Sequence, residues 1–119
     1  MDPSTFTTYV LGYLIPYFDE LRRQGKLRNY KKSIKDAHGK VWSYVGEIDG
    51  KGRACGVGVA KDKQGYLKRG MFINDKFEGV GVFMGLGERF EGEYADDVQH
   101  GKITKYSFGN IYNEIYDKG

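Results

Sequence analysis

The feature that most constrains the fold is a pattern that repeats every 22 residues in the second half of the chain. Its clearest copy places an aromatic residue, a glycine and a second aromatic at alternate positions, which are Phe90, Gly92 and Tyr94. The corresponding residues 22 positions before and after it are Lys68, Gly70 and Phe72, and Tyr112, Glu114 and Tyr116. A looser copy 24 residues before Lys68 consists of Tyr44, Gly46 and Ile48. A unit of this length holds two β-strands with their turns, whereas a strand, a crossover helix and a parallel strand need roughly 30 residues or more. The repeat therefore predicts a series of β-hairpins.

Glycines two residues apart form the second element of the repeat, and they share one face because alternate residues of a strand do so. One pair is Gly56 and Gly58, and the next is Gly79 and Gly81. A strand that is bare at these positions leaves a trough, and we expect aromatic rings of a neighbouring strand to lie in it. On this hypothesis, replacing Gly92 by alanine would destabilise the protein mainly through lost ring packing.

Seven strands follow from the positions of the repeat and of the turn residues between its parts. Their expected bounds are 42–49, 56–61, 66–73, 80–84, 88–95, 102–106 and 110–116. The residues expected to carry the repeat structure are Tyr44, Gly46, Gly56, Gly58, Gly70, Phe72, Gly79, Gly81, Phe90, Gly92, Tyr94, Gly101 and Tyr112. Because each short unit must bury its apolar face against its neighbours, we expect one elongated core.

The repeat units resemble the membrane occupation and recognition nexus repeat, or MORN repeat, in which an aromatic, a glycine and an aromatic at alternate positions precede a central glycine pair. The resemblance is carried by Phe90, Gly92, Tyr94, His100, Gly101 and Gly109 in one unit, and by Gly70, Phe72, Gly79, Gly81 and Gly87 in the unit before it. It covers residues 44–119, with departures at Lys68, Ile103 and Glu114. The resemblance implies consecutive antiparallel hairpins in one twisted sheet. Residues 112–119 would then act as a capping strand, as terminal units of repeat arrays often do.

The N-terminal segment has the signals of an amphipathic helix over residues 2–24. Asp2 is the expected N-cap and Pro3 fits the first helical position, where its missing N–H costs nothing. Apolar residues then recur at three- and four-residue spacing, which is typical of a helix with one buried face. They are Phe6, Val10, Leu14, Tyr17, Phe18 and Leu21. Pro16 would clash with the carbonyl of Gly12 in a regular helix, so we expect a kink or two short helices.

Seven cationic residues cluster at and beyond the end of this helix. They are Arg22, Arg23, Lys26, Arg28, Lys31, Lys32 and Lys35. The spacing of Leu27, Tyr30 and Ile34 leaves a second short helix open. The cations favour two interpretations equally: they are merely solvated, or they bind anionic lipid headgroups or acidic protein surfaces. For the apolar stripe of the helix we favour packing on the protein's own sheet, because a bare sheet face needs a cover.

These observations predict a mainly β protein, in which consecutive antiparallel hairpins form one elongated twisted sheet and an N-terminal amphipathic helical segment packs on it. We expect two parts: a helical segment with the basic stretch over residues 1–40, and a repeat sheet over residues 41–119.

Residue types that carry chemistry are sparse. Cys55 is the single cysteine, so an internal disulfide is excluded, and His38 and His100 lie far apart in the sequence. The glycines of residues 79–87 precede no helix start with the lysine and hydroxyl residue that a phosphate-binding loop needs. An acidic cluster is expected to be split between solvent and turns and not to bind a cation; it consists of Glu88, Glu91, Glu93, Asp96 and Asp97. We therefore expect no enzyme activity, no metal site and no cofactor.

Our first functional hypothesis is a non-catalytic scaffold or accessory subunit that binds other proteins within a larger assembly. The alternatives are a peripheral membrane module that binds acidic phospholipids through residues 22–35, and a regulatory repeat fragment of a larger enzyme. A formal charge of +3 is too small to indicate nucleic acid, and the acidic cluster would repel phosphate. The lone cysteine favours an intracellular location. The resemblance favours cytoplasmic, cytoskeletal or ciliary structures; a mitochondrial location and self-association stay open.

Overall fold

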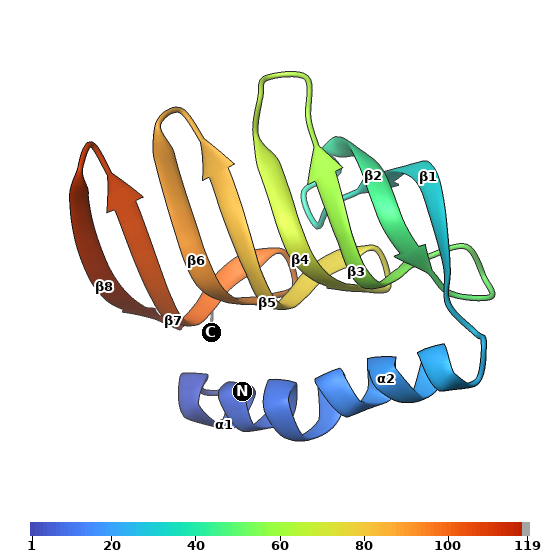
Figure 1. Ribbon diagram of the computed structural model, residues 1–119. Helices are drawn as coiled ribbons and strands as arrows, with labels where there is room; N and C mark the ends of the chain where they lie inside the picture. Colours follow the sequence, from blue (N-terminus) through green and yellow to red (C-terminus); the bar gives the residue numbers. More distant parts are fainter. Residues whose placement is uncertain (118–119) are drawn as a thin grey trace.

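The computed structural model describes residues 1–117, which form one open sheet of eight strands with an N-terminal helical segment packed on it (Figure 1). Each strand pairs antiparallel with the one before it, so the order in the sheet is the order in the chain. The strands are β1 (Arg28–Lys35), β2 (Val41–Ile48), β3 (Ala54–Lys61), β4 (Leu67–Ile73), β5 (Lys76–Gly85), β6 (Glu88–Ala95), β7 (Val98–Ser107) and β8 (Asn110–Tyr116). The predicted fold class, a mainly β chain of consecutive hairpins with a packed helical segment, is confirmed.

The second short helix that the sequence left open over residues 27–34 does not form, because this segment forms β1. Arg28–Lys35 pairs with β2 along its whole length, from Arg28 opposite Ile48 to Lys35 opposite Val41. A helix of two turns is marginal on its own. The edge of β2, in contrast, offers a complete ladder of backbone partners. The sheet therefore begins at Arg28, within the part of the chain that we assigned to the helical segment.

Two kinds of turn connect the strands. Four turns contain only two residues, both with positive φ, as type I′ hairpin turns require; they are 74–75, 86–87, 96–97 and 108–109. The three remaining turns share an Asp-x-x-Gly pattern, in which the aspartate accepts the N–H groups two and four residues later. These aspartates are Asp36, Asp49 and Asp62, followed at the fourth position by Gly39, Gly52 and Gly65, all with positive φ. The tight turns explain why β5 and β7 are longer than predicted.

A row of five glycines crosses the middle of the sheet. The register places one glycine beside the next on β2 to β6, namely Gly46, Gly58, Gly70, Gly81 and Gly92. The register shifts immediately after the glycines of β2, β4 and β6. Such irregularities bend a strand. The sheet is accordingly curved, and its concave side, the inner face, forms a trough.

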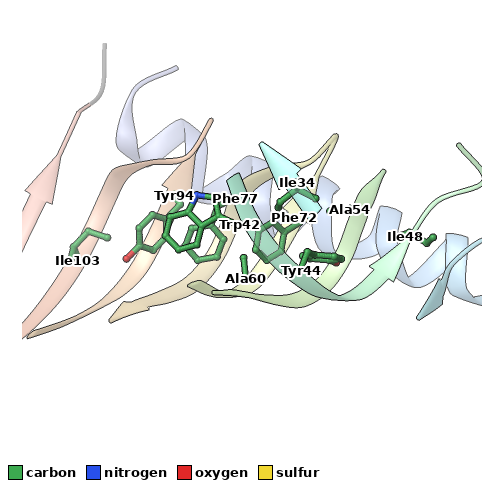
Figure 2. Packing of buried hydrophobic residues seen from close by; sticks show 10 residues of the cluster. All are labelled: Ile34, Trp42, Tyr44, Ile48, Ala54, Ala60, Phe72, Phe77, Tyr94 and Ile103. Atoms are coloured by element: carbon green, nitrogen blue, oxygen red, sulfur yellow. The ribbon is translucent and has the colours of Figure 1, made fainter. Parts of the chain in front are cut away.

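Aromatic rings cover glycines in this trough: Gly58 is covered by the Tyr44 ring of a neighbouring strand, as predicted, whereas Gly81 is covered by the Phe77 ring of its own strand. A Cβ atom added to Gly58 would stand 2.4 Å from the Tyr44 ring, and one added to Gly81 would stand 2.3 Å from the Phe77 ring. Four buried rings follow each other along the trough, with centroids separated by 5.0, 5.2 and 4.4 Å. They are Tyr44, Phe72, Phe77 and Tyr94 (Figure 2). Their contacts run from strand to strand and hold neighbouring units together.

The helical segment consists of α1 (Pro3–Tyr9), a π-helical turn (Val10–Leu14) and α2 (Ile15–Arg23). The predicted cap is confirmed, because Asp2 accepts the Thr5 N–H at 2.9 Å. The helix passes Pro16 without a break: the Ile15 N–H bonds to the carbonyl of Val10, and this wider turn accommodates the proline.

The segment lies across the strands at the end of the sheet that carries the turns 74–75 and 96–97 (Figure 1). The predicted stripe is buried against Cys55, Met71 and Ala95, on the convex or outer face; its fully buried members are Phe6, Val10, Leu14 and Phe18. Leu21 is half-buried, whereas Tyr17 is 39% exposed and does not belong to the buried stripe. The prediction that the stripe packs on the protein's own sheet is therefore confirmed.

Candidate functional site

The seven cations of the predicted basic patch do not form one surface. Arg22 and Arg23 on α2 form ion pairs with Glu47 and Glu20 respectively. Lys32 turns to the inner face, where its ammonium donates to the Gly52 carbonyl at 2.5 Å. The remaining four are exposed: Lys26, Arg28, Lys31 and Lys35. Lys26 precedes β1, and the alternation of β1 directs Arg28 to one face and Lys31 and Lys35 to the other. What they share is the edge of the sheet, where charged side chains hinder unwanted pairing with other strands.

Two carboxylates of the outer face hold the helical segment at its two ends. Glu47 on β2 accepts two hydrogen bonds of 2.7 Å from the Arg22 guanidinium, and Glu93 on β6 accepts the Thr7 hydroxyl at 2.8 Å. Glu93 was expected to be solvated, but the helix covers it and it is only 8% exposed. The same Glu47 carboxylate also accepts the Val57 N–H at 2.8 Å. Position 47 therefore ties helix, β2 and β3 together.

The protonation of Glu47 should make helix docking depend on pH. Burial acts to raise the pKa of Glu47, but the hydrogen bonds from Arg22 and from the Val57 N–H outweigh it and the pKa lies below its usual value. A carboxylate with a lowered pKa stabilises the fold above its unfolded pKa, and that stability is lost as pH falls through the folded pKa.

We expect Glu47→Gln to lower the free energy of unfolding by about 1–2 kcal/mol at pH 7. The difference from the parent chain should shrink as the pH falls below the usual range of glutamate pKa values, because Glu47 then becomes protonated in the parent as well. Urea unfolding at several pH values measures it. Glu20→Gln, in an exposed pair with Arg23, is the matched control and should change nothing measurable. An equal loss of stability at pH 3 and pH 7 would contradict the assignment.

Lys68 occupies the place where the repeat pattern expects an aromatic residue, and it lies buried in the trough. Its ammonium lies 3.6 Å from the Asp97 carboxylate and 4.5 Å from the centre of the Trp42 ring. Burial lowers the pKa of Lys68, while Asp97 opposes that shift. Asp97 also accepts the backbone N–H groups of Ala37 and Phe77, at 2.7 and 2.8 Å. The pair thus joins the β1–β2 turn, β4 and β5, and closes the trough.

The other residues considered for a chemical role are buried in packed surroundings, which fit a structural role. His100 is 1% exposed and stands edge-on to the Phe6 ring at 5.0 Å. Cys55 is 2% exposed beneath the helix, and burial raises the pKa of its thiol to about 11. Within residues 1–117 no three His, Cys, Asp or Glu side chains are grouped so that they could hold a metal ion. In the same part of the chain, no helix has the length and apolar character needed to cross a membrane.

An exposed apolar strip on the outer face is the most prominent surface feature. It lies on the half of that face that the helix leaves uncovered, and sequence reasoning did not predict it. We call it the valine strip: Val45 on β2, Val57 and Val59 on β3, and Val80 and Val82 on β5. Val45, Val57 and Val80 are 53, 51 and 46% exposed. The exposed Arg69 on β4 lies between β3 and β5, and the half-buried Glu91 on β6 lies beside Val82, so the strip has charges of both signs.

The strip follows directly from strand alternation. One row of residues crosses the sheet from β2 to β6, and each member lies opposite the next on the neighbouring strand. The row consists of Val45, Val59, Arg69, Val82 and Glu91. The residues next to them along each strand are the glycines and rings of the trough on the inner face. Because successive side chains of a strand point to opposite faces, the side chains of this row point to the outer face. Apolar patches on a protein surface mark sites of protein contact more often than chance.

Comparison of the chain with models of protein families found no matching family, and comparison with characterised proteins found no match.

Proposed function

We propose that the chain is a non-catalytic scaffold of the MORN-repeat kind, which binds a partner protein on the valine strip. The observation that carries the proposal is the exposure of three valines on the outer face, Val45, Val57 and Val80, next to a helix that already packs on the same face. A convex apolar surface with isolated charges of both signs suits a protein surface better than a phosphate backbone or a small molecule.

The partner element that fits the strip is an amphipathic helix. The chain's own helix crosses the outer face and places apolar side chains on Cys55, Met71 and Ala95. The valine strip lies on the same face, spans β2 to β5, and offers β-branched side chains. A second helix beside the first would cover the strip and leave its own polar face in solvent.

The phospholipid alternative has less support. It needs an apolar stripe free to enter the lipid, and the stripe of Phe6, Val10 and Leu14 is buried on the sheet. It also needs clustered cations, and three of the seven, Arg22, Arg23 and Lys32, are paired with carboxylates of the chain. We extend the scaffold proposal to an intracellular assembly, with a cytoskeletal or ciliary structure favoured by the MORN resemblance.

We expect a double variant, Val57→Lys with Val80→Lys, to lose its specific partner while the fold is retained, because both side chains are about half exposed. The matched control, Leu11→Lys with Tyr13→Lys, places the same charges on the exposed side of the helix. Affinity capture from the source cell, with all three chains compared quantitatively, measures the effect. The proposal requires a protein that the parent and the control retain and the strip variant loses about tenfold or more.

Crosslinking and peptide identification should then place a helix of that protein on β2, β3 or β5. Capture that is equal for all three chains, or crosslinks confined to the helical segment, would contradict the proposal.

A further inference from the structure

The two edges of the sheet differ in a way that points to their use. The first edge, β1, carries Arg28, Lys31, Lys32 and Lys35. The other edge, β8, carries no cation and exposes Ile111, Tyr112 and Ile115 by 64, 47 and 74%. An apolar edge strand is a template for pairing with another strand, and cations on an edge prevent such pairing. The chain thus protects one edge and leaves the other competent to pair.

The turn before β8 determines which backbone groups point to this free edge. Phe108 and Gly109 form a two-residue turn, so Ser107 and Asn110 are a hydrogen-bonded pair. Hydrogen-bonded and non-hydrogen-bonded residues alternate along an antiparallel pair. Asn110, Tyr112, Glu114 and Tyr116 therefore bond to β7. The N–H and C=O groups of Ile111, Asn113 and Ile115 face outward.

This set of outward groups is symmetric about Asn113. If a second β8 runs antiparallel to the first with Asn113 opposite Asn113, then Ile111 of each chain lies opposite Ile115 of the other. Each backbone N–H and C=O group that faces outward then lies opposite such a group of the second copy, and the pairing extends over the whole strand. On the inner face Tyr112 would lie opposite Glu114 of the second copy, next to the Lys105 ammonium, which is 5.8 Å from the Tyr112 ring. We infer that β8 pairs with β8 of a second copy about a two-fold axis at Asn113, joining the two sheets into one.

A second copy fits this edge better than an unrelated strand for two reasons. The register is self-complementary in backbone, in apolar contacts and in charge, as an isologous interface requires. The two-fold pair also closes the assembly, because the joined sheet ends on both sides in the charged β1 edge. The inference does not depend on the partner of the valine strip, which lies on the sheet face.

Sedimentation equilibrium over a range of protein concentrations tests the association. We expect a dimer with a dissociation constant that rises about tenfold or more in Ile115→Lys and in Asn113→Pro. Proline at 113 removes an N–H that faces solvent in the monomer, so the fold should tolerate it. Leu11→Lys, 62% exposed on the helical segment, is the control and should dimerise like the parent. A chain that stays monomeric, or a dimer that survives both edge variants, would overturn the inference.

Engineered cysteines test the register. The Cα atoms of a hydrogen-bonded antiparallel pair lie about 5.5 Å apart, within the range of a disulfide. Asn113→Cys should therefore give a covalent dimer on mild oxidation. Ile111→Cys should not, because the two copies of residue 111 would be offset by four residues, or about 13 Å. The native Cys55 is 2% exposed and should not compete. Equal crosslinking by the two variants, or crosslinking by Ile111→Cys alone, would overturn the two-fold pairing at Asn113.

Discussion

Phe77→Ala is expected to lower the free energy of unfolding by about 3–5 kcal/mol, the loss typical of a large aromatic side chain removed from a core. The Phe77 ring is 1% exposed and lies between Phe72 and Tyr94, with centroids 5.2 and 4.4 Å away. It also covers Gly81 on its own strand. The vacated space cannot refill easily, because the neighbouring rings are fixed by the bent strands. Contacts between two repeat units would be lost together.

Urea unfolding followed by tryptophan fluorescence measures this loss, since Trp42 lies in the same core. Phe108→Ala removes the same side chain from a turn where it is 85% exposed, and it should change stability by less than about 0.5 kcal/mol. If the two variants were equally stable, the rings of the trough would not be the core of this protein.

Gly92→Ala should cost at least about 3 kcal/mol, and for a reason that sequence reasoning did not give. We expected lost ring packing. A Cβ atom at this position would instead stand 2.0 Å from the Lys102 carbonyl oxygen and 3.0 Å from the Cα of Ile103 on β7. The φ of Gly92 is +154°, which other residues rarely adopt. Both costs come from backbone that cannot move without separating β6 from β7.

The matched control for Gly92→Ala is Gly12→Ala on the helical segment. A Cβ atom at Gly12 would have no neighbour within 4 Å, so this change should be neutral or stabilise the protein by up to about 1 kcal/mol. Thermal unfolding of the two variants beside the parent chain makes the comparison. A Gly92→Ala protein as stable as Gly12→Ala would show that the close approach of β6 and β7 is not required.

The repeat was sufficient to predict the hairpins because its glycines mark positions where a ring or a neighbouring backbone approaches closely, as at Gly58, Gly81 and Gly92. The segment that became β1 lies outside the repeat. Its apolar residues Leu27, Tyr30 and Ile34 fit a helix, and only pairing with β2 favours a strand. Three of the turns could be recognised in the sequence, because the Asp-x-x-Gly pattern at Asp36, Asp49 and Asp62 recurs every 13 residues.

Candidate surfaces were harder to predict than the fold, because they depend on which side of the sheet is covered. The basic residues are contiguous in sequence but the end of the helix and the alternation of β1 separate them in space. The valine strip shows the opposite case. Val45, Val59 and Val82 are far apart in sequence, and they meet only through the register of β2 to β5. Their exposure could not be predicted before the position of the helix on the outer face was known.

The most direct measurement of the central claim, that rings lie on glycines to build the trough, is a double-mutant cycle between Phe77→Leu and Gly81→Ala. A Cβ atom at Gly81 would stand 2.3 Å from the Phe77 ring, so alanine should cost about 1–3 kcal/mol in the parent chain. If the ring causes that cost, it should fall by about 1–2 kcal/mol when leucine replaces Phe77. The same cycle with Gly92→Ala, whose clash is with backbone, should show a coupling below about 0.5 kcal/mol. Additive effects at Gly81, or equal coupling at both glycines, would contradict the account.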